Sequence, residues 1–306
     1  MKKNLPAYLV SSTSTLALFY LVTVSALWQV YELSGSVAQL GLVTLFPFVP
    51  ALLLFPWLGQ VADRYPKRQI MLITSGLSLL VAIGLMVLSG LGTMKVGWIF
   101  LAVALVSSIR SYEATTLASW VPEWTPPSEL SRVLALVACS KQVAKIAAPV
   151  LSGFLLIIEP SGRVVYLVMG ALALTSLLSL SLFTPARKRR LRVAVAPTPK
   201  DTWEGLRYVR QNEVLFGALL LDLVAGLLGG FTAIIPVFAK EILHTDAAGA
   251  GALRSMIAIG SLLGAAGLAS FPLKNHLGRC LVQSVTALGV VTLVLAHVNY
   301  FPLAAV

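Results

Sequence analysis

Ionisable side chains occur inside long apolar segments of this 306-residue chain. Arg110 and Glu113 lie three residues apart, so on a helix they share a face and can form an ion pair. Lys141 and Lys145 lie four residues apart and also share a face, where two like charges need water, a carboxylate or an anionic ligand. Asp222 stands alone in a third apolar segment. A charge in a membrane span costs about 2.5–3.5 kcal/mol on insertion scales, so each residue is a functional candidate.

Two interpretations are open for each of these positions. Asp222 can carry a proton, or it can be a structural carboxylate bonded to a neighbouring helix. Arg110 and Glu113 can form a substrate or proton site, or an internal ion pair that fixes the rotation of a helix. Lys141 and Lys145 can face a cavity and favour an anionic substrate, or they can extend to lipid phosphates near the cytoplasmic surface.

Charges near the ends of apolar segments, and prolines within them, have simpler interpretations. We expect Arg254 to extend to the outer surface. We expect Glu32 to lie at the membrane interface, with a gate residue as the alternative. Pro47, Pro50 and Pro56 remove backbone hydrogen bonds, so they predict kinks in the segment that contains them.

The segments that must position these residues are membrane-spanning helices. The chain is 58% hydrophobic and 11% charged, whereas soluble domains carry roughly 25% charged residues. A helix that spans the bilayer needs roughly 20 apolar residues, and lipid offers its backbone no hydrogen-bond partners. Nine such spans are predicted, at residues 8–30, 38–60, 70–90, 96–117, 132–157, 164–184, 214–238, 248–271 and 280–300. The basic stretch before the seventh span includes an amphipathic segment, residues 201–210, that we expect to lie on a membrane surface.

The distribution of positive charge predicts the topology. With the N-terminus in the cytoplasm, 16 of the 23 Lys and Arg residues lie in cytoplasmic segments, and only Lys95, Arg163 and Lys240 lie in outer loops. This bias follows the positive-inside rule. It also accounts for the net charge of +11 without nucleic acid as a partner. We therefore predict a multi-pass protein of a bacterial-type inner membrane with a cytoplasmic N-terminus.

A ten-residue motif lies between the second and third predicted spans, at residues 59–68, and reads GQVADRYPKR. It resembles the loop signature of the major facilitator superfamily, roughly G-x-L-A-D-R-x-G-R-K. The matching residues are Gly59, Ala62, Asp63, Arg64, Lys67 and Arg68. A small residue such as Gly59 permits close helix contact, and Asp63 can face the positive end of a neighbouring helix. Arg64 and Arg68 can pair with Asp63 and with lipid phosphates.

The resemblance implies the fold and a role for the motif. The fold would be an all-α membrane protein, with a six-helix N-terminal bundle at residues 1–185 and a cytoplasmic linker at residues 186–213. An incomplete C-terminal bundle of three spans would follow at residues 214–306, so the chain is expected to be truncated relative to the twelve-span plan. The motif residues would form the cytoplasmic gate, which latches the two halves together in the outward-facing state.

Further stretches favour one branch of that family. Residues 122–130 resemble the loop between spans four and five of drug:proton antiporters, the branch of macrolide efflux proteins and the enterobactin exporter. Asp222, the glycines that follow it and Pro236 also resemble that branch. The implied activity is proton-coupled efflux of a small amphipathic or anionic molecule by alternating access. Arg110, Glu113, Lys141, Lys145 and Asp222 would line the substrate and proton path.

Other functions have less support in the sequence. The chain contains no P-loop and no H-E-x-x-H motif, so we expect neither cofactor nor metal and no enzymatic activity. The alternatives to transport are a truncated, non-transporting fragment and a permease subunit of an ATP-driven system. The expected partners are the lipid bilayer, a small-molecule substrate and protons, and the chain is expected to act as a monomer.

Overall fold

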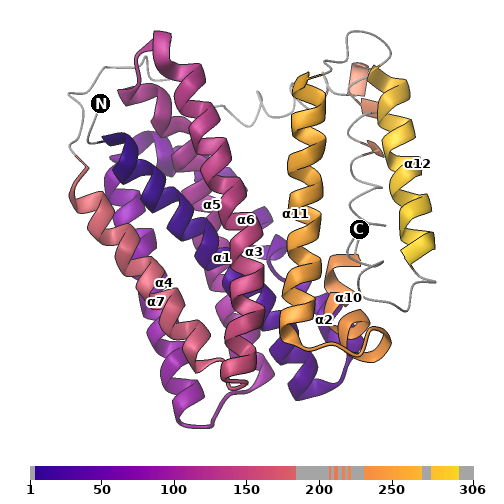
Figure 1. Ribbon diagram of the computed structural model, residues 1–306. Coiled ribbons are helices and arrows are strands. Elements are labelled where there is room, and N and C mark those ends of the chain that lie inside the picture. Colours follow the sequence, from indigo (N-terminus) through magenta and orange to yellow (C-terminus); the bar gives the residue numbers. More distant parts are fainter. Residues whose placement is uncertain are drawn as a thin grey trace. The chain divides into compact units, whose positions relative to one another are not determined.

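The computed structural model describes residues 4–183, 207, 210–212, 216–217, 220–221, 231–270 and 277–295 (Figure 1). Within them the fold is helical and contains no strand. The helices of the first half are α1 (Asn4–Ser34), α2 (Val37–Leu45), α3 (Phe48–Arg64), α4 (Lys67–Gly90), α5 (Val96–Trp124), η1 (Pro127–Glu129), α6 (Leu130–Ile158) and α7 (Arg163–Ser181). They are followed by α10 (Phe231–Val237), η2 (Phe238–Ile242), α11 (Ala247–Ser270) and α12 (Leu277–Leu295).

Six of the predicted spans correspond to helices that are long and apolar enough to cross a bilayer. They include α1, α4, α5, α7 and a segment that joins η1 to α6. The sixth is the Ala247–Gly264 part of α11. The ninth predicted span contains a shorter apolar helix, Val282–Leu293. Most of the seventh span and of the amphipathic segment at residues 201–210 lies outside the described residues.

The second predicted span is divided into two helices. α2 ends at Leu45 and α3 begins at Phe48, with Pro47 between them. Proline has no amide proton and cannot continue the hydrogen-bond ladder of the preceding turn. Pro50 and Pro56 lie within α3, which continues through both positions. Only one of the three predicted interruptions is therefore a break between helices.

Small and polar residues hold α1 in the centre of the N-terminal helices. α1 packs against α5, α6 and α7. The Ser11 hydroxyl lies 2.8 Å from the Ser176 hydroxyl of α7, which is also 2.9 Å from the Ser75 hydroxyl of α4. On the α6 side, the Ser152 hydroxyl donates to the Leu21 carbonyl at 3.1 Å. Small hydroxyl side chains permit close helix approach and bond across the contact, as is typical of membrane bundles.

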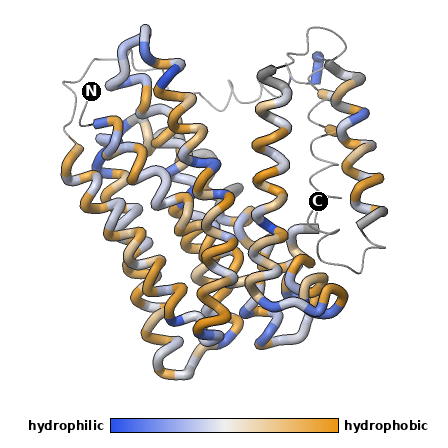
Figure 2. The backbone as a smooth tube through the Cα atoms, in the orientation of Figure 1, coloured by the Kyte–Doolittle hydropathy of each residue, from blue (hydrophilic) through white to orange (hydrophobic). Residues whose placement is uncertain are grey.

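Large apolar side chains occupy both the core and the outer surface. One buried cluster includes Leu21, Val103 and Met169, and a second includes Tyr8, Trp120 and Trp124. Leu80 and Leu178 are nevertheless 64% and 67% exposed. Apolar residues run along the long helices in Figure 2. Extensive apolar surface of this kind is rare on soluble monomers and fits helices that face lipid.

Contact density divides the chain into two compact units. The first contains Met1–Leu191 together with Ala233–Ala258, and the second contains Arg192–Thr232 together with Ile259–Val306. Most of α10, η2 and the first half of α11 therefore belong to the same unit as the N-terminal helices. All the interactions described below lie within this first unit. The predicted division at residues 185 and 213 stays a prediction.

Candidate functional site

Arg110 and Glu113 form an ion pair within α5. Nη1 of Arg110 lies 3.5 Å from Oε2 of Glu113, as their spacing of three residues predicts. Glu113 is only 2% exposed, whereas Arg110 is half-buried. The pair therefore brings a carboxylate into the interior of the helix bundle, with its cation nearer the edge.

The carboxyl group of Glu113 retains hydrogen-bonding capacity. Thr15 of α1 and Thr74 of α4 lie within interaction range of this group. Their hydroxyls, however, donate to the backbone carbonyls of Ser12 at 3.4 Å and Met71 at 3.1 Å. Oε1 of Glu113 consequently has no hydrogen bond from any described residue. A buried polar atom without a partner is unusual and marks a position where a proton or a ligand group can bind.

Lys141 and Lys145 lie in the middle of α6 and are both half-buried. Lys141 lies within electrostatic range of Arg110 and of Lys145. The part of the chain that the structure describes supplies neither lysine with a carboxylate within salt-bridge distance. The structure thus brings the predicted residues of α5 and α6 together as a group with excess positive charge.

Arg254 lies deeper than we predicted. It is the eighth residue of α11, and its neighbour Ser255 donates a hydrogen bond to the Ile146 carbonyl of α6 at 2.6 Å. Ile146 lies near the middle of α6, directly after Lys145. The expectation that Arg254 extends to the outer surface from the start of its span is therefore wrong. It lies at the level of Lys145, because close packing of α6 and α11 sets the relative positions of the two helices.

Two glycines permit that close packing. A Cβ atom on Gly153 of α6 would lie 2.2 Å from the Ala247 carbonyl oxygen. A Cβ atom on Gly251 of α11 would lie 2.3 Å from the Pro149 carbonyl oxygen. Farther along the pair, Nε2 of Gln142 donates to the Ala258 carbonyl at 2.8 Å. The contacting positions rise along α6 as they fall along α11, so the two helices are antiparallel.

The motif of residues 59–68 is fastened to neighbouring helices at its basic end. Nζ of Lys67 lies 2.7 Å from Oε1 of Glu123 and donates to the Ser119 carbonyl at 2.9 Å. Both acceptors belong to the last turns of α5. The C-terminal end of a helix carries partial negative charge, so a lysine there is stabilising.

Arg68 makes the equivalent contact with α7. Its Nε donates to the Leu180 carbonyl at 2.9 Å, and its Nη2 donates to the Ser181 carbonyl at 3.2 Å. These carbonyls are partners that the sequence did not predict, and the predicted pairing of Arg68 with Asp63 and with lipid phosphates stays a prediction. Arg64 is exposed at the end of α3.

Some predicted site residues lie outside the described part of the chain. Asp222 is not among the described residues, and for Gly59 and Asp63 only the helical backbone is described. Sequence reasoning did not identify Glu123 as the partner of Lys67. The available signal was its position after Pro122, at the end of a predicted span and on the same side of the membrane as the motif.

A second charged cluster joins the end of α1 to η2. Nζ of Lys240 lies 2.7 Å from Oε1 of Glu32 and 5.7 Å from the centre of the Tyr31 ring. The Tyr31 hydroxyl lies 3.0 Å from Oε1 of Glu241 and donates to it. The hydrogen bond that Lys240 donates to Glu32 raises the pKa of the lysine. Glu32, expected to be a plain interface residue, therefore has a specific partner.

Comparisons with known proteins agree with the helical architecture. The family model of the Major Facilitator Superfamily matches residues 5–306. A comparison with curated proteins gives no match. Among solved structures, the chain is similar to a bacterial homologue of the human lysosomal transporter Spinster in its inward-facing, unoccupied conformation, with a TM-score of 0.66 and 17% identity. The match covers 89% of this chain and 64% of that chain.

Two further solved structures show the same fold. The same Spinster homologue in its inward-facing, occupied conformation gives a TM-score of 0.61 at 17% identity, covering 88% of this chain and 61% of that one. The D-xylose–proton symporter gives a TM-score of 0.52 at 14% identity, covering 82% and 65%. The chain therefore spans a little less than two thirds of the length of these proteins.

Proposed function

The chain belongs to the major facilitator superfamily, and from that premise we propose that it is a secondary active transporter. Its action would be efflux of a small amphipathic or anionic molecule by alternating access, with proton entry as the driving force. It would act as a monomer in a bacterial-type inner membrane. The observation that carries this proposal is the set of ionisable side chains inside an apolar helix bundle, because such residues are costly unless a transported ion or substrate uses them.

Glu113 is the described residue best suited to carry the proton. Its Oε1 is buried and has no hydrogen bond from the described residues, while Oε2 contacts Arg110. The group can therefore exchange between an ion pair with Arg110 and a protonated acid without breaking another hydrogen bond. The D-xylose–proton symporter is a precedent for proton coupling on this fold. Asp222 is proposed as the second acid on the path.

The motif of residues 59–68 supports the proposed gate at the cytoplasmic side. Lys67 and Arg68 anchor the start of α4 to the ends of α5 and α7. The start of α4 is thereby fixed, and a fixed loop end would suit a latch. Gly59 would let α3 approach a neighbouring helix. Assignment to the drug:proton antiporter branch rests on sequence resemblance alone.

Transport can be tested in phosphatidylcholine proteoliposomes with an imposed pH gradient. The probes are ethidium, an amphipathic cation, and 1-anilinonaphthalene-8-sulfonate, an amphipathic anion. We expect gradient-dependent movement of at least one probe, and its loss on addition of a protonophore. Glu113→Gln and Asp222→Asn should each lower the initial rate by about tenfold or more, which corresponds to a barrier increase of about 1.4 kcal/mol.

Glu129→Gln is the matched control, because this carboxylate lies in the short helix before α6 and outside the proposed path. It should leave the rate unchanged. If neither probe moves faster than in empty liposomes, secondary transport of these classes by this chain is excluded. If flux persists without a gradient and in both carboxylate variants, coupling through these acids is wrong.

A further inference from the structure

The charges within the predicted spans do not balance. Away from the span ends four are basic, namely Arg110, Lys141, Lys145 and Arg254, and two are acidic, Glu113 and Asp222. Arg132, the first residue of its span, is counted with the cytoplasmic charges. Two positive charges stay unneutralised even if Asp222 pairs with one of the lysines. An unpaired charge in such surroundings is expensive, so a group of them favours an anion that the chain itself does not supply.

The geometry of α6 and α11 places Lys145 and Arg254 on the same side of their contact. Ser255 bonds to the backbone of Ile146, so these two residues mark where the antiparallel helices face each other. Lys145 lies one position before Ile146, and Arg254 lies one position before Ser255. One position corresponds to a rotation of about 100° around a helix. Because the helices run in opposite directions, the two rotations turn both side chains toward the same side.

That side is the one that faces α1. Ser152 lies seven residues after Lys145, about two helical turns, and therefore on nearly the same face of α6. Its hydroxyl bonds to the Leu21 carbonyl of α1. Arg254 lies within electrostatic range of Tyr20, the residue before Leu21. Lys145 and Arg254 thus point toward the inner helix α1, not toward lipid.

Lys141 and Arg110 extend the same positive surface. Lys141 lies one turn before Lys145 on α6, and it lies within electrostatic range of both Lys145 and Arg110. Lys141, Lys145 and Arg254 are all half-buried, so the site is reached by solvent or ligand but shielded from bulk water. Among the described residues the structure shows no carboxylate in a salt bridge with any of these three.

We propose that Lys145 and Arg254, with Lys141, form a binding site for the anionic group of an amphipathic substrate. The guanidinium of Arg254 provides the planar, paired donors that suit carboxylate, sulfonate or phosphate oxygens. The lysines supply additional charge at one edge. The inference rests on the proposed transport function, because the bound anion is taken to be the transported substrate. The predicted binding can nevertheless be measured without a pH gradient.

The test is equilibrium binding to the chain in phosphatidylcholine nanodiscs. The probes are 1-anilinonaphthalene-8-sulfonate and N-phenyl-1-naphthylamine, which share an aromatic frame and differ by the sulfonate. After subtraction of empty nanodiscs, we expect the sulfonate to bind about tenfold more tightly than the neutral amine, as one charge-assisted hydrogen-bonded contact would produce. Arg254→Gln and Lys145→Gln should each remove most of that preference. Arg254→Lys should retain part of it.

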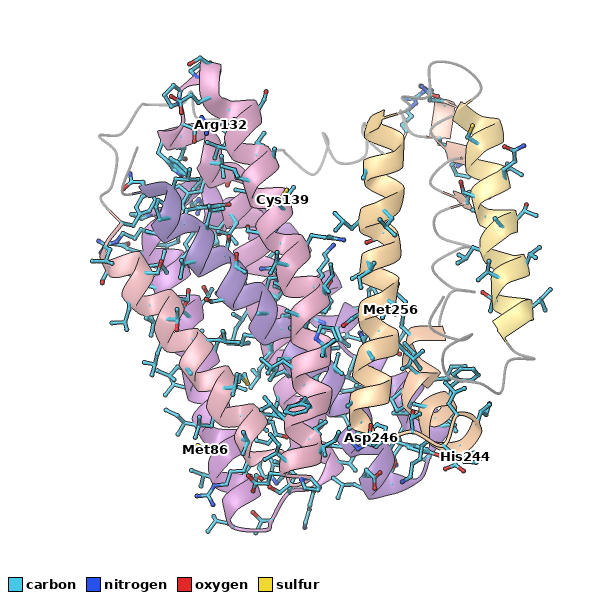
Figure 3. All side chains as sticks on the ribbon, in the orientation of Figure 1. Met86, Arg132, Cys139, His244, Asp246 and Met256 are labelled. Atoms are coloured by element: carbon cyan, nitrogen blue, oxygen red, sulfur yellow. The ribbon has the colours of Figure 1, made fainter. Side chains whose placement is uncertain are left out.

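Arg132→Gln is the control, because Arg132 is an exposed cation at the far end of the same helix, α6 (Figure 3). It should leave the preference unchanged. Thermal unfolding of each variant identifies loss of fold, and if Arg254→Gln is unfolded, Lys145→Gln in the Arg254→Lys background replaces it. Equal binding of the two probes, or an intact preference in folded Arg254→Gln, would overturn the proposal.

Three outcomes distinguish this anion site from a lipid-binding site and from the transport mechanism. Displacement of the sulfonate by phosphatidylglycerol in the nanodisc would assign the site to a lipid headgroup and would also overturn the proposal. Gradient-driven ethidium flux by a chain without sulfonate preference would reject the anion site and leave the proposed transport standing. Sulfonate preference without coupled flux would support the anion site while rejecting the transport mechanism.

Discussion

Arg110 and Glu113 illustrate how a buried ion pair depends on both partners. The carboxylate of Glu113 is enclosed by α1, α4 and α5, and Arg110 is its only ion-pair partner among the described residues. Removing one member of such a pair leaves an uncompensated charge, whereas removing both is better tolerated. The pair should therefore show strong coupling in stability.

We expect Arg110→Gln to destabilise the protein by about 2–3 kcal/mol, somewhat less than for a fully buried pair because Arg110 is partly exposed. The double variant Arg110→Gln/Glu113→Gln should recover at least half of that loss. Thermal unfolding in detergent, followed by tryptophan fluorescence, measures both. Additive losses in the double variant would show that the two side chains do not stabilise each other.

The contribution of Lys240 to stability can be tested by its pH dependence. This residue lies at the surface, between α10 and α11. Its pKa is raised in the folded protein by the hydrogen bond that it donates to Glu32. The charged form is therefore stabilised by folding, and this contribution is fully present below the pKa of an unfolded lysine, about 10.4. It is lost as the pH rises through the folded pKa.

Lys240→Met should thus lower the unfolding temperature at pH 8, and this effect should become smaller as the pH rises past the pKa of an unfolded lysine and through the folded pKa. Both side chains of the pair are more than 40% exposed, so the contribution should not exceed about 1 kcal/mol. The comparison is made by scanning unfolding of both proteins from pH 8 to pH 11. If the difference in unfolding temperature between the two proteins grew with pH, the contact between Lys240 and Glu32 would not stabilise the charged lysine, and the assignment would be contradicted.

At the level of helices, the α6–α11 contact depends on two glycines. Their backbones approach so closely that a methyl group at Gly153 or Gly251 would overlap a carbonyl oxygen of the partner helix. Backbone atoms cannot move aside as a flexible side chain can. Substitution must therefore separate the helices and disturb the hydrogen bonds of Ser255 and Gln142.

Gly153→Ala and Gly251→Ala should each destabilise the protein by about 1–3 kcal/mol, the usual cost of overpacking. Gly84→Ala is the matched control, since Gly84 is a helical glycine of α4 with open space at the Cβ position. Alanine there should be neutral or stabilising by up to about 1 kcal/mol. The unfolding temperatures of the three variants measure these effects. Equal effects at all three sites would assign the loss to helix propensity and not to the contact.

At the level of the molecule, helix ends that are predicted to face the same side do meet. The Ser89 hydroxyl at the end of α4 donates to the Ser161 carbonyl before α7 at 2.9 Å, and Nε2 of Gln29 near the end of α1 donates to the same carbonyl at 3.3 Å. Lys67 at the start of α4 and Glu123 at the end of α5 meet on the other side of the bundle. These contacts agree with the predicted alternation of the spans, and the side that faces the cytoplasm stays a prediction.

Orientation can be measured with cysteines in a Cys139→Ser/Cys280→Ser background. An impermeant maleimide added to intact cells should label Lys95→Cys and Arg163→Cys, which lie in the predicted outer loops. Arg64→Cys and Arg132→Cys should react only after the membrane is permeabilised. The reversed pattern would place the N-terminus outside, and labelling of all four would show that the spans do not alternate.

The membrane class, most of the spans and the family of this protein could be predicted from its residues alone. Apolar segments of this length must become helices because lipid leaves the backbone no other hydrogen-bond partners. The Gly59–Arg68 motif and the charged positions within spans could likewise be recognised from residue type and spacing alone. Spacing along one helix was also sufficient for Arg110 and Glu113, since three residues make nearly one turn.

The contacts between residues of different helices, in contrast, became known from the three-dimensional structure. Arg254 was placed at the wrong depth, and Glu123 and Glu32 were not assigned their lysine partners. Those contacts depend on how far one helix slides along another. That distance is set by close approach at Gly153 and Gly251 and by side chain–backbone bonds such as Ser255 to Ile146. Hydrophobic patterning cannot fix it, because an apolar helix can slide along its neighbour in lipid with little change in the apolar surface it buries.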